Sequence, residues 1–175
     1  MAFAALPGFY QILFLYVEPS ERSFPLIALL SPGGTEWMFY QFVPSADPVP
    51  PPGMLNANSV MVVWQLVNCY VLLCCISSIV FRAVRDSLSH DPVAQEQIVG
   101  ASLLALAIGD VGIRMLIIVT MAALPEPLRY SPLTWNSMTH GNISSVVFLL
   151  SARIAWFAGV GRTRYYFGQP KMKLN

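Results

Sequence analysis

The segment from Ser59 to Phe81 contains no charged residue and consists mostly of Val, Leu, Ile and Cys. It is long enough to cross a bilayer, because a spanning α-helix needs about 20 mostly apolar residues. A run of this kind strongly restricts the folds open to a chain. It predicts a helix that spans a membrane.

Three further segments have the same character, and they cover residues 7–30, 98–124 and 143–161. The first is interrupted by Glu18, Glu21 and Arg22, and it spans only if its helix continues past Pro19, where we expect a kink. The alternative is that residues 1–17 form a signal peptide. Because that stretch lacks a basic start, a retained helix is favoured.

Composition supports this interpretation. Hydrophobic residues make up 55% of the 175 residues and charged residues only 11%, whereas a soluble domain has about a quarter charged. The net charge of +1 does not indicate the basic surface that nucleic-acid-binding proteins carry. We therefore predict an all-α fold, an integral membrane four-helix bundle forming one domain over residues 1–175.

Lysine and arginine predict the orientation in the membrane. The loop between the second and third segments and the tail at 162–175 hold six of these residues, whereas the outer loops hold only Arg129. The six are Arg82, Arg85, Arg162, Arg164, Lys171 and Lys173. By the positive-inside rule, both termini are expected in the cytoplasm, with the endoplasmic reticulum as the expected membrane.

The loop at residues 31–58 is expected on the outer face. Its Pro-Val-Pro-Pro-Pro run at 48–52 predicts an extended polyproline conformation. Four aromatic residues precede that run. They are expected to rest on the membrane interface, and the alternative is that they cap the bundle. They are Trp37, Phe39, Tyr40 and Phe42.

Ionisable residues inside the apolar segments are the main candidates for a site. Asp110 and Arg114 are four residues apart in the third segment, Glu18 lies in the first and Arg153 in the fourth. The predicted topology places all four at similar depth, with the amides of Gln65 and Asn68 nearby. Because one such residue costs about 2.5–3.5 kcal/mol at a helix centre, they are expected to pair inside the bundle.

Two interpretations of this group remain open. The residues could form a polar clamp that fixes helix packing. Alternatively, Glu18 or Asp110 could be a catalytic acid that donates a proton in a low-dielectric site. Glu18 is the first choice, because Pro19 is expected to disturb its i,i+4 geometry with Arg22, whereas Arg114 lies one turn from Asp110.

Polar residues that lead into the fourth segment extend the candidate site. A pocket open toward the outer leaflet is expected, with seven residues binding a substrate: Gln65, Asn68, Arg114, Trp135, Asn136, Asn142 and Arg153. Trp64, Tyr70, Trp135 and Trp156 are candidate rings that face a cation. No metal and no cofactor is expected, because Cys69, Cys74 and Cys75 lack metal-ligand spacing.

Several motifs carry a resemblance to a known family. They are FLYVEP at 14–19, WQLVNCYVLL at 64–73, AIGDVG at 107–112, TWNSMTHGNI at 134–143 and ARIAWFAG at 152–159. Together they resemble a fungal family of small four-helix membrane proteins of unknown function, often encoded near natural-product biosynthesis genes. The family commonly has His shortly after the aspartate and Trp before the final Gly-Asn, where this chain has Arg114 and His140.

The resemblance implies a setting in secondary metabolism. The expected role is to act on a hydrophobic intermediate. The chemistry is suggested by a separate, architectural analogy: small helical membrane enzymes of the sterol-isomerase type and fungal transmembrane terpene cyclases protonate a substrate with a buried carboxylic acid. By this analogy the expected reaction is non-redox cyclisation or isomerisation of terpenoid-like or polyketide-like substrates. The alternative is a non-enzymatic scaffold or lipid-binding accessory protein, with membrane-bound biosynthetic enzymes as partners. The two differ in the surroundings of the acids: a catalytic acid faces a cavity, whereas a clamp acid is fully paired with arginine.

Overall fold

The computed structural model describes residues 3–42, 53, 55–124 and 126–168, and within the third long helix it leaves out the side chains at 113–118, 120 and 123. All regular structure in this part of the chain is helical, as predicted. The long segments are α1, η1 and α2 (Phe9–Ile12, Leu13–Val17, Glu18–Leu30); α4, η2 and α5 (Ala57–Cys75, Ile76–Val80, Phe81–Ser87); α6 (Pro92–Ala123); and α8, η4 and α9 (Ser137–His140, Gly141–Ser145, Val146–Ala158).

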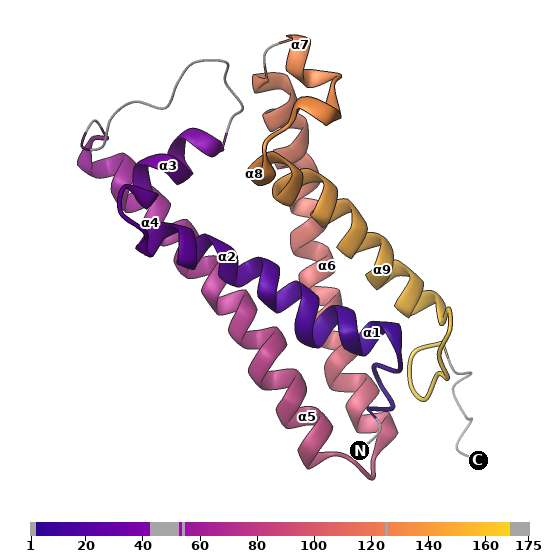
Figure 1. Cartoon of the computed structure of the whole chain (residues 1–175). Coiled ribbons are helices and arrows are strands. Elements are labelled where there is room, and N and C mark those ends of the chain that lie inside the picture. Colours follow the sequence, from indigo (N-terminus) through magenta and orange to yellow (C-terminus); the bar gives the residue numbers. More distant parts are fainter. Residues whose placement is uncertain (1–2, 43–52, 54, 125, 169–175) are drawn as a thin grey trace.

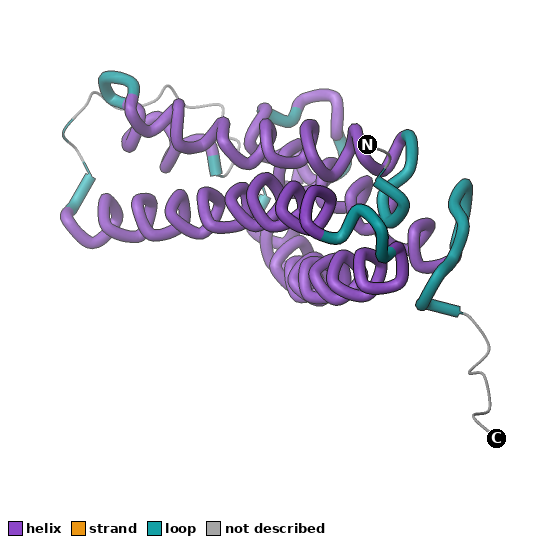
Figure 2. Tube along the Cα trace, turned by 90° about the horizontal axis from the view of Figure 1, so that it is seen from below, coloured by secondary structure: helices purple, strands orange, loops and turns teal. Residues whose placement is uncertain are grey.

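These four segments run up and down in alternating directions (Figure 1). Residues 3–8, the turn between α5 and α6 and residues 159–168 lie at one end of the bundle, which we call the basal end. The short helices α3 (Gly34–Gln41) and α7 (Glu126–Arg129), the 3-10 turn η3 (Pro132–Thr134) and α8 lie toward the other end. The view from below shows the segment containing α2 running beside the one containing α4 (Figure 2).

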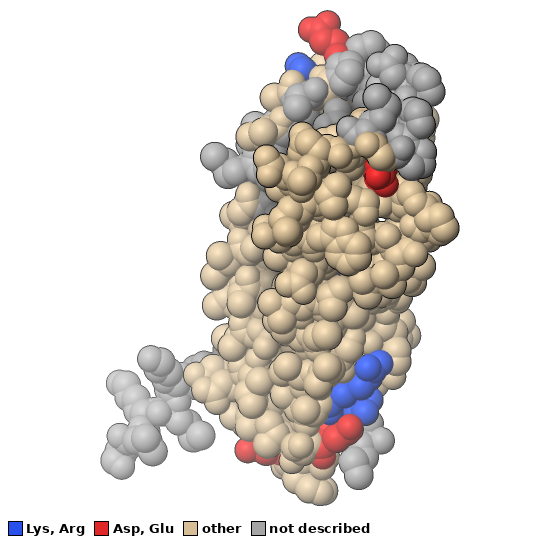
Figure 3. Space-filling model, turned by 90° about the vertical axis from the view of Figure 1, so that its left-hand side faces the viewer, with Lys and Arg blue, Asp and Glu red and all other residues tan. Residues whose placement is uncertain are grey.

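Three of the four segments are long and apolar enough to cross a membrane, namely Ala57–Ser87, Pro92–Gly112 and Ser137–Ala158. The last of these segments begins at Ser137 and not at the predicted residue 143, because Asn136 caps the N-terminus of α8. Figure 3 shows a broad uncharged band between charged ends on the side formed by the α2 and α4 segments. Length, composition and this band indicate a multi-pass membrane protein.

The first segment is continuous through Pro19, because a π-helical turn precedes it. The backbone N–H of Glu18 donates to the carbonyl of Leu13, an i→i−5 bond, so the hydrogen-bond register changes just before the proline. Pro19 then lies in the first turn of α2, where a missing N–H is tolerated. Side chains on both sides of Pro19 therefore stay on one helical segment.

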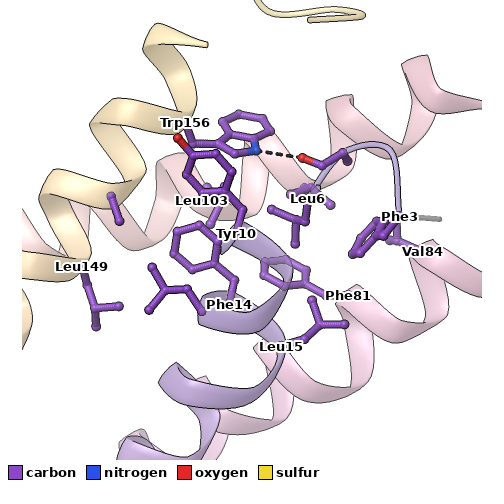
Figure 4. Close-up of a cluster of buried hydrophobic side chains, with 14 residues drawn as sticks. Phe3, Leu6, Tyr10, Phe14, Leu15, Phe81, Val84, Leu103, Leu149 and Trp156 are labelled. Atoms are coloured by element: carbon purple, nitrogen blue, oxygen red, sulfur yellow. Dashed lines mark hydrogen bonds between the residues drawn. The ribbon is translucent and has the colours of Figure 1, made fainter. Parts of the chain in front are cut away.

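The basal half of the bundle has an aromatic core (Figure 4). Phe14 and Phe81 are fully buried between the helices, and the stacked ring of Tyr10 lies 6.2 Å from that of Phe14. The indole N–H of Trp156 donates to the carbonyl of Ala5 at 2.8 Å. This bond ties the N-terminal residues to α9.

The opposite end is closed by part of the expected outer loop. Helix α3 carries Met38, which is fully buried against Leu29 and Val63, and Trp37 and Phe39 pack on the same cluster. These aromatic residues thus help to cap the bundle, which is the alternative to the favoured interfacial position. The predicted polyproline stretch at 48–52 lies outside the described residues.

Candidate functional site

Four charged side chains form one cluster in the middle of the bundle, and we call it the ion cluster. Its members are Glu18 and Arg22 on α2, Asp110 on α6 and Arg153 on α9. The side chains of Glu18 and Arg153 are completely buried, that of Asp110 is 5% exposed and that of Arg22 is 13% exposed. Two acids and two bases balance each other, so the cluster has no formal net charge.

Arg153 joins three helical segments through its guanidinium group. Its Nη2 lies 2.6 Å from Oε1 of Glu18, and its Nη1 donates to Oδ2 of Asp110. The ring of Phe14 lies 5.8 Å from the same guanidinium carbon. The fork of the guanidinium can direct one nitrogen to each acid, which the single ammonium of a lysine cannot do with fixed geometry. The predicted convergence of Glu18, Asp110 and Arg153 is therefore present.

The expectation that Glu18 stays apart from Arg22 is wrong. Arg22 places Nε at 3.0 Å and Nη2 at 2.6 Å from Oε1 of Glu18. The π-helical turn before Pro19 keeps α2 regular between the two residues, so the i,i+4 pair forms. Glu18 consequently contacts two guanidinium groups, and it is the most heavily paired acid of the cluster.

Asp110 has its arginine partner on another helix. The expected neighbour Arg114 lies in α6, but its side chain is outside the described residues. Arg153 supplies the contact across the bundle. Two buried atoms of the cluster have no hydrogen-bond partner among the described residues, Oε2 of Glu18 and Nε of Arg153. Pairing within the cluster thus uses one carboxylate oxygen of each acid.

Two hollows lie away from the ion cluster. A groove of about 580 Å³ between α6 and α9 is lined by eight apolar residues, including Leu104, Ala107, Ile108 and Ile154. A second hollow of about 400 Å³ lies at the basal end beside Ala4, Arg162 and Tyr165. Neither hollow has Glu18 or Asp110 in its lining. The observed contacts of both acids are with arginines.

The candidate residues before the fourth span serve as links between helices. Asn136 accepts hydrogen bonds from the N–H and the hydroxyl of Thr139, and its amide donates to the carbonyl of Gln41 at 3.1 Å. Asn142 accepts a bond of 3.1 Å from the hydroxyl of Tyr70. The ring of Trp135 lies 5.5 Å from that of His140. These contacts join α3 to the start of α8, and α4 to η4.

Gln65 and Asn68 lie on the exposed side of α4. The buried residues of this helix are Val63 and Val67, which pack against Leu29 of α2. At 100° per residue, Gln65 lies about 160–200° from both valines around the helix. The two amides therefore do not line the bundle interior with the ion cluster.

A third buried acid, Glu96, was not singled out from the sequence. Glu96 of α6 is fully buried and accepts hydrogen bonds from the backbone N–H groups of Tyr165, Tyr166 and Phe167. Its Oε1 also lies 2.9 Å from Nη1 of Arg162. Residues 162–168 of the expected basic tail thus fold back on the bundle. We call Glu96 and Arg162 the basal pair.

Trp156, a candidate ring for facing a cation, does face one from the protein itself. The guanidinium carbon of Arg162 lies 3.8 Å from the centre of the indole ring. Arg162 also donates from Nε to the carbonyl of Trp156 at 2.8 Å. Arg162 follows directly after a predicted span and stands in a run with other basic residues. This pattern predicted a solvated side chain and not a buried one.

A family model covers most of the chain, from residue 3 to residue 163. The protein belongs to the family of the domain of unknown function DUF7704. The matched region contains the ion cluster, the basal pair and all four helical segments. No curated protein and no solved structure matches the chain. Membership in this family carries no assigned activity, so the function has to be argued from the site.

Proposed function

We propose that this DUF7704 protein is a non-catalytic membrane protein that binds a long apolar chain and supports membrane enzymes acting on hydrophobic intermediates. The surroundings of the two acids carry the proposal. Glu18 contacts Arg22 and Arg153, Asp110 contacts Arg153, and neither acid borders a described hollow. A proton-donating acid needs access to its substrate, whereas a clamp needs complete charge pairing.

The groove between α6 and α9 supplies the binding site in this proposal. Its volume of about 580 Å³ is within the usual range of ligand pockets, roughly 300–1,000 Å³. Its lining is apolar, and two of its residues, Ile108 and Ile154, are more than half exposed. Because the groove lies within two candidate spans, an acyl or isoprenoid chain of a molecule already in the bilayer can enter from the side.

The proposed setting follows from charge and resemblance. Basic residues at the basal end support a cytoplasmic position for that end by the positive-inside rule, with the endoplasmic reticulum as the proposed membrane. The resemblance to small membrane proteins encoded near biosynthesis genes suggests natural-product metabolism. In this role the protein would hold a lipophilic intermediate for a neighbouring membrane enzyme.

Charge-balanced double variants separate this proposal from acid catalysis. Glu18→Gln with Arg22→Gln removes one acid and one base, and Asp110→Asn with Arg153→Gln removes the other pair. Each variant leaves one acid–arginine pair from the cluster. If the acids are structural, both variants should restore the lipophilic metabolite profile of a gene-deletion strain, provided that protein levels match wild type.

The opposite result would support catalysis. A double variant that accumulates to wild-type level but fails to restore the profile would identify the missing acid as part of the chemistry. The candidates for this acid are two, because Glu18 and Asp110 are the buried acids of the ion cluster among the described residues. Measuring protein level beside the metabolites keeps loss of folding distinct from loss of chemistry.

Ligand binding in the groove has its own test. Ile154→Trp should fill the groove and reduce labelling of the purified protein by a photoreactive fatty acid. Ile27→Trp is the matched control, because Ile27 is 63% exposed on α2, outside the groove lining. Equal labelling of both variants would show that the fatty acid does not bind in the groove.

A further inference from the structure

Helix α4 carries an exposed face that does not take part in its packing against the described residues. Four of its residues follow one another at spacings of four, three and four, the pattern of a two-helix seam. They are Met61, Gln65, Asn68 and Leu72, and all four are exposed. The opposite face, with Val63 and Val67, is the one that packs inside the bundle.

The two amides make this face unusual for a helix surrounded by lipid. Gln65 and Asn68 lie about 12 and 17 Å along the helix from its start, well inside a candidate span. Neither side chain has a hydrogen-bond partner among the described residues. An amide exposed to hydrocarbon is costly, and in membranes Asn and Gln side chains commonly hydrogen-bond across helices.

We propose that this face, which we call the amide seam, is the interface of a homodimer in the membrane. Two copies of one chain have the same topology, so a two-fold axis along the membrane normal brings their α4 helices together in parallel. Each amide then meets its own counterpart at equal depth. Because an amide is both a donor and an acceptor, Gln65 can pair with Gln65 and Asn68 with Asn68.

A second copy fits this face better than lipid or an unrelated helix. Lipid chains offer no hydrogen bond to either amide. An unrelated helix would need two amides at matching depth and spacing, which a second copy has by symmetry. The apolar ends of the seam, Met61 and Leu72, are 59% and 61% exposed and would be covered in the same contact. The inference does not depend on the proposed function.

Cysteine cross-linking of the full-length protein in lipid vesicles tests the geometry. In a background with Cys69, Cys74 and Cys75 replaced by Ser, Leu72→Cys and Met61→Cys should each give a disulfide-linked dimer. Trp64→Cys is the control, because Trp64 is 45% exposed on the same helix but lies about 100° from Gln65. A disulfide requires Cα atoms within about 7 Å, so the control should stay monomeric.

Loss of the amides tests the energetics. Gln65→Leu combined with Asn68→Leu should raise the dimer dissociation constant in vesicles about tenfold, measured by energy transfer between labelled copies. Gln97→Leu, at an exposed position near the basal end of α6, should leave it unchanged. A monomeric wild-type protein, or cross-linking of Trp64→Cys as efficient as that of Leu72→Cys, would overturn the proposal.

Discussion

The ion cluster and the basal pair both bury an acid with arginine, but they satisfy the acid in different ways. Among the described residues, Glu18 and Asp110 have only arginine side chains as partners. Glu96 has one arginine and three consecutive backbone N–H groups. The partner available to an acid thus changes between the middle of the bundle and its end.

The position of each acid along the membrane-spanning helices explains this difference. In the middle of a spanning helix every backbone N–H is already bonded within the helix. After α9 ends, the chain at 165–167 is no longer helical, so its N–H groups are free to meet an acid. An acid in the middle of the bundle therefore needs a charged side chain as its partner, whereas an acid at the basal end can also accept hydrogen bonds from the backbone. Removing one charge should be more costly in the middle.

The largest effect is expected for Arg153→Gln. This change leaves Asp110 buried without its arginine and removes one of the two partners of Glu18. Breaking a buried ion pair from one side costs about 3–5 kcal/mol. The free energy of unfolding in detergent micelles should fall by this amount.

Arg85→Gln serves as the control for that measurement. Arg85 pairs with Asp86, whose side chain is 61% exposed. Exposed pairs contribute less than about 1 kcal/mol, so the control should be close to wild type. Equal losses for the two variants would mean that the ion cluster contributes no more than a surface pair.

A smaller effect is expected for Glu96→Gln. Glutamine keeps the shape and one acceptor oxygen but loses the charge that Arg162 and the N–H groups face. Hydrogen bonds to charged groups contribute about 1.5–3 kcal/mol, and residues 162–168 can be solvated once released. Under native conditions, trypsin should cleave the Glu96→Gln variant after Arg162 or Arg164 faster than it cleaves the wild type. An unchanged cleavage rate would show that Glu96 does not hold this segment.

The smallest effect is expected for Gly100→Ala, which alters the basal end without removing a charge. A Cβ at Gly100 would lie 2.1 Å from the ring of Phe167, so the ring has to move. We expect a loss of about 1 kcal/mol, the low end of overpacking costs, because Phe167 is only half-buried. Gly109→Ala is the control, since a Cβ there meets nothing within 4 Å. Faster trypsin cleavage only in Gly100→Ala would show that the ring and Glu96 hold the same segment.

The sequence predicted the helical segments and the meeting of the buried charges. Apolar length indicates three candidate spans, and the alternating directions of the four helical segments bring Glu18, Asp110 and Arg153 to one level. Both depend on one-dimensional quantities, segment length and position along it. These quantities are visible in a single chain.

Features that depend on rotation about a helix axis or on irregular backbone were not predicted. The π-helical turn at 13–17 carries the chain through Pro19 and permits the Glu18–Arg22 pair. Gln65 faces outward because Val63 and Val67 take the inner side of α4. Glu96 accepts hydrogen bonds from the backbone of residues 165–167, and backbone partners of this kind cannot be predicted from the residue types.

The role of the ion cluster as a clamp is tested most directly by a double-mutant cycle on Asp110 and Arg153. The free energy of unfolding would be measured for wild type, Asp110→Asn, Arg153→Gln and the double variant, which keeps the Glu18–Arg22 pair. The account predicts that the double variant is more stable than either single variant, with a coupling energy of about 2–3 kcal/mol. Additive losses, with a coupling energy near zero, would contradict it.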